Sequence, residues 1–172
     1  VFSLGQDELD ALNQNGYVSV NMRDKNIFGR SEENLRIVGM STHTLAVRPA
    51  TGGDYGGTAL LRIKYGHSGE SLLNTRGQTY QFNHYRTASV NPIVWKTVYD
   101  GIDETLTETT VSAASDSLLK FLLEDELGHV NPDLMLYSRP AAWADILISK
   151  EVTTSSGEDM RIDELRIRVQ YD

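Results

Sequence analysis

The C-terminal stretch Leu165-Arg-Ile-Arg-Val-Gln-Tyr171 decides the fold class. Its apolar side chains alternate strictly with Arg and Gln, which is the period-two pattern of a β-strand with one buried face. The same alternation occurs in Leu61-Arg-Ile-Lys-Tyr65. Weaker versions of it predict further strands over residues 17–22, 35–40, 42–48, 79–85, 93–99, 134–137 and 143–149. No helices alternate regularly with these strands, so the sequence predicts an all-β fold, an antiparallel β-sandwich of the jelly-roll type.

Two segments depart from the strand pattern and predict helices. Residues 112–127 have leucines at helical spacing between a capping residue, Ser112, and a stop at Gly128, and predict a helix that covers part of the core. Residues 7–15 carry apolar residues at helical spacing and precede Gly16, so they predict a short N-terminal helix that closes one end of the sandwich.

Length, charge and cysteine content limit the classes of function. The 172 residues fit one domain, and we interpret residues 1–172 as a single sandwich cut from a larger protein, because the chain starts at Val1 without Met or a signal-like segment. A net charge of −8 opposes binding to nucleic acid and to anionic membranes. No apolar run approaches the roughly 20 residues of a spanning helix, so no membrane insertion is expected. The absence of cysteine excludes disulfides and thiolate sites.

Motifs for catalysis are weak in this chain, and we assign no catalytic residue. The four histidines lie in separate segments without zinc-site spacing, and no Gly-x-Ser-x-Gly elbow is present. Sequence alone does not establish the carboxylate pair of a glycosidase, so a glycoside-active enzyme is kept as a second alternative. Asp100, Asp103 and Glu104 follow a predicted strand and are candidate calcium ligands, because calcium takes oxygen ligands from flexible loops. A solvated acidic turn is the alternative.

Two segments are predicted to form loops. Residues 49–57 contain Gly52-Gly-Asp-Tyr-Gly-Gly57, which lacks the Lys-Ser/Thr ending of a phosphate loop but has the glycines to present Tyr55 at a loop tip. A flexible hairpin connection with an incidental tyrosine explains the same residues. The second predicted loop covers residues 151–159, which are rich in Thr, Ser and Gly.

Aromatic residues are the main binding candidates. Trp143 shares strand parity with Asp145, which predicts exposure or burial at an interface. Pro140 restricts Arg139 to extended conformations and forms a corner before Trp143, and both residue types are enriched at binding hot spots. The alternative is that Trp143 closes the end of the core with Arg139 laid over it. The full set of candidate binding residues is Trp143, Arg139, Tyr137, Tyr55 and Tyr85.

Three segments together resemble a known family: Leu35-Arg-Ile-Val-Gly-Met40, Thr58-Ala-Leu-Leu-Arg-Ile-Lys-Tyr65 and Ile162-Asp-Glu-Leu-Arg-Ile-Arg-Val-Gln-Tyr171. Their order resembles the C-terminal β-sandwich region of large insecticidal toxin-complex A subunits and related secreted toxin-like proteins. The resemblance implies a secreted or extracellular, non-catalytic domain that docks a partner subunit or a surface receptor.

These observations lead to two expectations of function. The first is an interaction module of a larger secreted, toxin-like protein that contacts a protein partner, a surface receptor or a cell-surface glycan. The alternative is a free-standing carbohydrate-binding module, which requires at least two aromatic rings exposed on one face or one set of loops. No cofactor is expected apart from the candidate calcium ion.

Overall fold

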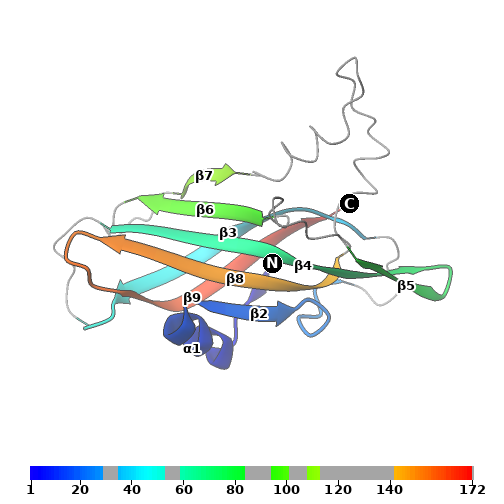
Figure 1. Ribbon diagram of the computed structural model, residues 1–172, viewed down its shortest axis with the longest axis horizontal. Helices are drawn as coiled ribbons and strands as arrows, with labels where there is room; N and C mark the ends of the chain where they lie inside the picture. The colour runs from blue at the N-terminus through cyan, green and yellow to red at the C-terminus, as the bar shows by residue number, and fades with distance from the viewer. Residues whose placement is uncertain (29–34, 53–58, 84–93, 101–107, 113–141, 172) are drawn as a thin grey trace, which may run out of the picture.

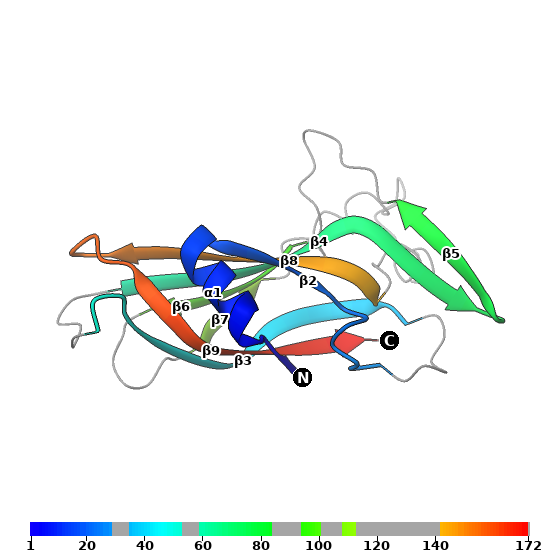
Figure 2. The ribbon, with the colours of Figure 1, turned by 90° about the horizontal axis from the view of Figure 1, so that it is seen from below.

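The structure of the chain is a computed structural model that describes all residues except 29–34, 53–58, 84–93, 101–107, 113–141 and 172. Within the described residues the fold is mostly β, with two antiparallel sheets packed together and the helix α1 beside them (Figures 1 and 2). The elements are β1 (Phe2–Ser3), α1 (Gln6–Asn15), β2 (Tyr17–Asn21), β3 (Ile37–Pro49), β4 (Ala59–Thr75), β5 (Gln78–Asn83), β6 (Val94–Asp100), β7 (Glu108–Ser112), β8 (Trp143–Thr154) and β9 (Met160–Tyr171).

The strand order separates the two layers. In the described part of the chain, the first sheet has the order β1-β9-β3, and the second has the order β2-β8-β4-β6-β7 with β5 paired to β4. Every pair is antiparallel. Figure 2 shows the sheets as two layers, with β9 and β3 in one and β8, β4 and β2 in the other. The prediction of an all-β protein with packed antiparallel sheets is confirmed at this level.

Strand β9 shows how the sequence pattern produces the sandwich. Leu165, Ile167 and Val169 are buried, as their alternation predicted. The strand begins earlier than the alternation predicted. A β-bulge at Asp163 shifts its register against β3 and interrupts the alternating pattern there. A bulge reverses the parity of the residues that precede it, so Ile162 also faces the core.

Strands β3 and β8 are longer than predicted. The two segments predicted over 35–40 and 42–48 form the single strand β3, whose pairing with β9 shifts register at two further points. The loop predicted over 151–159 is wrong in its first part, since residues 151–154 continue β8 opposite β4. Their Thr-rich composition suits a strand as well as a loop. His67, expected in a loop, lies in β4 opposite Ile146.

The predicted N-terminal helix is confirmed as α1. The carboxylate of Glu8 accepts a hydrogen bond of 2.7 Å from the Gly5 N–H, and Gly16 ends the helix in the left-handed conformation with φ 79°. Leu9 and Leu12 are buried in the core. The helix contacts β2, β8 and β9, so it closes the side between the two sheets (Figure 2). The helix predicted over 112–127 lies outside the described residues, apart from Ser112, which ends β7.

Asn13 fastens α1 to the edge of β9. Its side-chain amide donates to the Ile162 carbonyl and accepts from the Ile162 N–H, each at 2.8 Å. Further along the same strand, β1 pairs with Arg166 and Ile167. The Asn13 amide therefore takes the place of a neighbouring strand, and satisfies two backbone groups that the short β1 does not reach.

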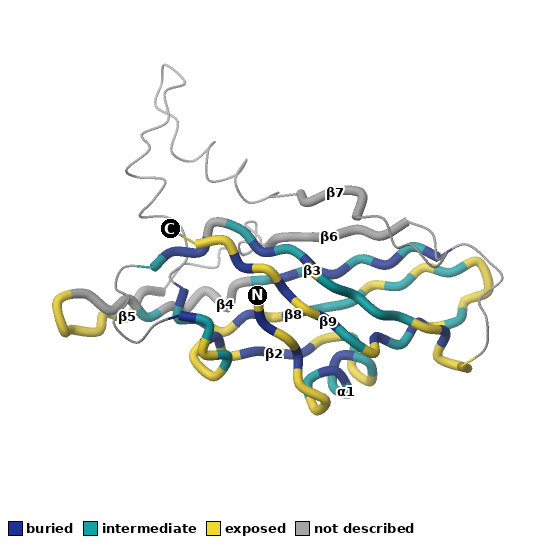
Figure 3. Tube along the Cα trace, turned by 180° about the vertical axis from the view of Figure 1, so that it is seen from behind, coloured by how far each residue is buried: buried dark blue, intermediate teal, exposed yellow. Residues whose placement is uncertain are grey.

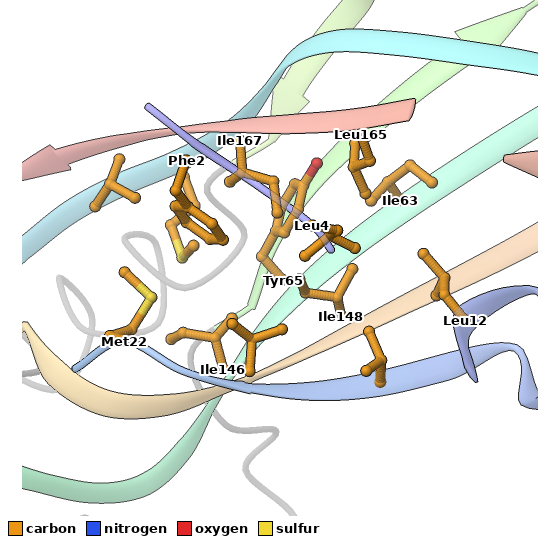
Figure 4. Packing of buried hydrophobic residues seen from close by; sticks show 14 of the residues in the cluster. Phe2, Leu4, Leu12, Met22, Ile63, Tyr65, Ile146, Ile148, Leu165 and Ile167 are labelled. Carbon is orange, nitrogen blue, oxygen red and sulfur yellow. The ribbon is translucent and has the colours of Figure 1, made fainter. Parts of the chain in front are cut away.

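A buried polar contact joins the two sheets in the described core. Tyr65 of β4 is fully buried among apolar side chains from both layers, including Ile148 and Ile167 (Figure 4). Its hydroxyl is hydrogen-bonded to Oγ1 of Thr42 on β3. A buried hydroxyl without a partner is costly, so this pairing fixes how β4 of one sheet lies over β3 of the other.

Replacing Tyr65 with Phe is expected to lower the free energy of unfolding by about 1–2 kcal/mol, because the ring stays buried while a buried hydrogen bond is lost. Chemical denaturation measures the change. Tyr17→Phe is the matched control. Because Tyr17 is 57% exposed, removal of its hydroxyl should leave the free energy of unfolding unchanged. Equal effects of the two substitutions would contradict the role given to the Tyr65–Thr42 contact.

Asn13→Ala is expected to destabilise the fold by about 1–3 kcal/mol, since it leaves the N–H and carbonyl of Ile162 unpaired at a partly buried edge. The neighbouring exposed residue Gln14 provides the control, and Gln14→Ala should have almost no effect because alanine is a good helix former. Amide hydrogen exchange at Ile162 should accelerate in Asn13→Ala only. Unchanged exchange there would show that the amide is not needed.

Candidate functional site

A metal centre is not visible in the described part of the chain. No group of three or more His, Asp or Glu side chains there could hold a metal ion. Of the candidate calcium ligands, Asp103 and Glu104 lie outside the described residues, and Asp100 ends β6 with its side chain undescribed. The calcium site therefore remains a prediction. The described helix is also too short and too polar to cross a membrane.

Trp143 is the predicted binding residue whose side chain the structure describes. Arg139, Tyr137, Tyr55 and Tyr85 lie outside the described residues. Trp143 is the first residue of β8 and is paired in register with Leu72 of β4. The side chain is partly buried and packs against the core cluster.

The parity predicted for β8 is confirmed. Asp145 and Leu147 are exposed, whereas Ile146 and Ile148 are completely buried. Trp143 has the parity of the exposed residues but is only partly exposed. The reason is Phe28, whose ring meets the indole edge to face, with centroids 5.2 Å apart and planes at 82°.

Phe28 also joins Trp143 to the opposite sheet. Its ring makes a second edge-to-face contact with Tyr171 of β9, at 5.1 Å between centroids and 87° between planes. Phe28 itself is only 5% exposed, while Tyr171 is 48% exposed. Edge-to-face pairs place the positive edge of one ring against the negative face of another and are favourable beyond the area that they bury. We call Phe28, Trp143 and Tyr171 the aromatic end.

Local hydrogen bonds place Phe28 between the sheets. Asn21 begins the turn after β2: its side-chain oxygen accepts from the Arg23 N–H at 2.9 Å, and its amide donates to Asp145 at 2.7 Å. Asn26 then adopts a left-handed conformation with φ 51°. Asn is among the residues that tolerate this conformation best, so the turn directs the chain back toward the core at Phe28.

The β4–β5 hairpin extends past the packed sheets beside the aromatic end (Figures 1 and 2). The pairing of β4 with β8 ends at Leu72 and Trp143, and among the described strands the rest of β4 pairs with β5 alone. Arg76 and Gly77 form the tip with φ 50° and 74°, which matches the two-residue type I′ turn that favours hairpins. Figure 3 shows this tip exposed in yellow.

Tyr80 is an exposed aromatic residue on this hairpin. It is 45% exposed, and its hydroxyl donates to the side-chain oxygen of Gln78 at 2.6 Å. With Tyr171, it gives this end of the molecule two of the large apolar side chains most exposed in the described structure.

Sequence reasoning found Trp143 but missed its partners. Tyr171 was visible as the last residue of the alternating C-terminal strand. Phe28 carried no signal, because it lies in a connection without strand or helix periodicity and is brought to the site by the turn that precedes it.

No protein-family model, curated protein or solved structure matches this chain. The resemblance to toxin-complex A subunits therefore depends on the sequence segments that suggested it.

Phe28→Ala is expected to lower the free energy of unfolding by about 3–5 kcal/mol, the usual range for truncating a buried Phe. Tyr171→Ala should change stability far less, because nearly half of that side chain is already in water. Denaturant titration of both variants makes the comparison. A smaller loss for Phe28→Ala than for Tyr171→Ala would show that Phe28 does not support the other two rings.

Proposed function

We propose that this chain is a non-catalytic interaction module of a larger secreted, toxin-like protein. Its partner is a protein or surface receptor that docks on the aromatic end and the β4–β5 hairpin. The observation that carries the proposal is the exposure of Tyr171 and Tyr80 at one end of the molecule, beside a hairpin that extends past the sheets. The scaffold that we propose for it is a jelly-roll-like sandwich with a covering helix over residues 112–127, as the sequence pattern favours.

Rigid aromatic side chains suit this role for a physical reason. Tyr and Trp bury a large area on binding and have few rotatable bonds, so they lose little conformational entropy when a partner covers them. At the aromatic end, Phe28 already contacts the rings of Trp143 and Tyr171. Rings that are held in place before binding reduce the entropic cost of forming an interface.

The hairpin supplies shape as well as apolar area. A partner could contact both the projecting β4–β5 hairpin and the aromatic end beside it. Within the described residues the arm is two strands wide, and a two-stranded ribbon is only marginally stable by itself in water. Contact with a partner would stabilise it.

A carbohydrate ligand is the alternative, supported by a specific observation. Phe28 contacts the rings of both Trp143 and Tyr171, so these two rings lie at the same end of the molecule. Sugar rings stack on exposed aromatic faces. Trp143 is only partly exposed, which favours a protein partner over a glycan.

The test is to screen the labelled domain against a panel of receptor ectodomains and a printed glycan array. We expect binding to a protein, and the double variant Tyr80→Ala with Tyr171→Ala should weaken it at least about 30-fold, as for a hot spot of 2 kcal/mol. Tyr17→Ala is the control, since Tyr17 is also exposed, at 57%, but lies on β2.

Two outcomes would contradict the proposal. One is binding to an ectodomain that the double variant leaves intact. The other is binding to glycans alone, with loss of binding in Trp143→Ala at unchanged stability, which would establish the carbohydrate alternative.

A further inference from the structure

The edge of β2 that faces away from β8 carries backbone hydrogen-bonding groups with no strand partner in the described part of the chain. The Lys150 N–H donates to the Gly16 carbonyl at 2.9 Å, and the Met22 N–H donates to the Ala144 carbonyl at 3.0 Å. The even-numbered residues of β2 therefore bond to β8. Because successive residues of a strand direct their N–H and carbonyl groups to opposite sides, Tyr17, Ser19 and Asn21 direct theirs away from β8.

Among the described residues, no strand pairs with this edge. β2 is the end strand of its sheet as far as the structure describes it. The side chains of Tyr17, Ser19 and Asn21 are all exposed. On the outward edge, the Asn21 carbonyl accepts a hydrogen bond of 3.2 Å from the Asp24 N–H, and the groups of Tyr17 and Ser19 make no further backbone contact with the described residues.

β2 also lacks the features that usually prevent an edge from pairing. Edge strands are commonly blocked by proline, by lysine, by a bulge or by very short length. The sequence Tyr17-Val-Ser-Val-Asn21 has neither a proline nor a charged residue, and its pairing with β8 runs without a register shift. In contrast, β1 has two residues, and the edge strand β3 is interrupted by shifts in register.

We infer that β2 pairs with β2 of a second copy of this chain, antiparallel and centred on Ser19. Ser19 is the middle residue of the strand and bonds outward, so a two-fold axis beside it sets Ser19 against its own counterpart. The same axis sets Tyr17 against Asn21 of the second copy. The two Ser19 residues can exchange both backbone bonds, as an isologous interface permits. At the Tyr17–Asn21 pairs the Asn21 N–H can donate to the Tyr17 carbonyl, because the Asn21 carbonyl already accepts from the Asp24 N–H.

The side chains agree with a second copy as the occupant. The pairs that would face each other are serine with serine and tyrosine with asparagine, so no like charges are opposed. Leu147 lies next to Ser19 in the sheet and is 46% exposed, and Tyr17 is 57% exposed. Pairing at β2 would extend the sheet across both copies and bring these apolar groups beside the new interface. The aromatic end and the hairpin take no part in it.

Cysteine cross-linking tests the register directly, because the natural chain has no cysteine. Directly opposed residues that share backbone hydrogen bonds have Cα atoms about 5.5 Å apart, within the range that a disulfide spans. Under mild oxidation, Ser19→Cys should form a covalent dimer. Ser3→Cys is the control, since Ser3 is exposed on β1 of the other sheet. Equal cross-linking of the two variants overturns the inference.

Sedimentation equilibrium of the unmodified chain and of two further variants completes the test. Ser19→Pro removes an N–H that β8 does not use, and proline is tolerated at such edge positions. It should weaken dimerisation at least about tenfold while circular dichroism and the melting temperature show an intact fold. Ser19→Ala keeps the backbone groups and should dimerise like the natural chain. A natural chain that stays monomeric, including one that binds an added Tyr-Val-Ser-Val-Asn peptide as a strand, overturns the inference of a second copy.

Discussion

The structure depends on burying the apolar faces of two sheets against each other. Each strand contributes one apolar row, and neither sheet can hide that row without the other. Tyr65 lies in the middle of this interface, fully buried, with its hydroxyl hydrogen-bonded to Thr42 of the facing sheet. Apolar contacts are not directional, so this polar contact, together with the shapes of the packed side chains, selects one position of β4 over β3. The aromatic end and the free edge of β2 are placed by the same arrangement.

The regular parts of this architecture could be predicted from the sequence, and the irregular parts could not. Period-two alternation identified the second half of β9 and the buried and exposed residues of β8. The first half of β9 escaped because the bulge at Asp163 reverses its parity, which a fixed period cannot represent. β1 escaped because two residues carry no measurable period, yet the backbone of Leu4 still donates to the Leu165 carbonyl at 3.1 Å.

The candidate site shows the same division. Trp143 was identified because its parity in β8 opposes that of Ile146. Its position in space, however, is determined by Phe28, and Phe28 is placed by side-chain hydrogen bonds in the turn after β2. Such contacts join residues far apart in sequence, and no local pattern encodes them. The sequence allowed two predictions for Trp143, a binding residue or a residue that closes the end of the core. Both describe part of its position, because the indole packs against the core and is also partly exposed.

The acidic residues are unevenly distributed along the sequence. Residues 100–133 contain nine of the 24 acidic residues and one of the 16 basic residues, so this segment alone accounts for the net charge of −8. The rest of the sequence is balanced, with 15 residues of each sign.

On the sandwich itself, charges of opposite sign lie side by side. Asp163 is bound by Arg48 at 2.7 Å and by Arg161 at 3.3 Å, and Arg161 also reaches Asp10 at 3.2 Å. Exposed pairs of this kind add little to stability, but they cancel the local field. Because salt screens charges beyond roughly 8 Å at physiological ionic strength, a partner that approaches the start of β9 meets these balanced pairs. Because Arg48 and Arg161 are already paired with carboxylates, they offer little free positive charge to a phosphate backbone.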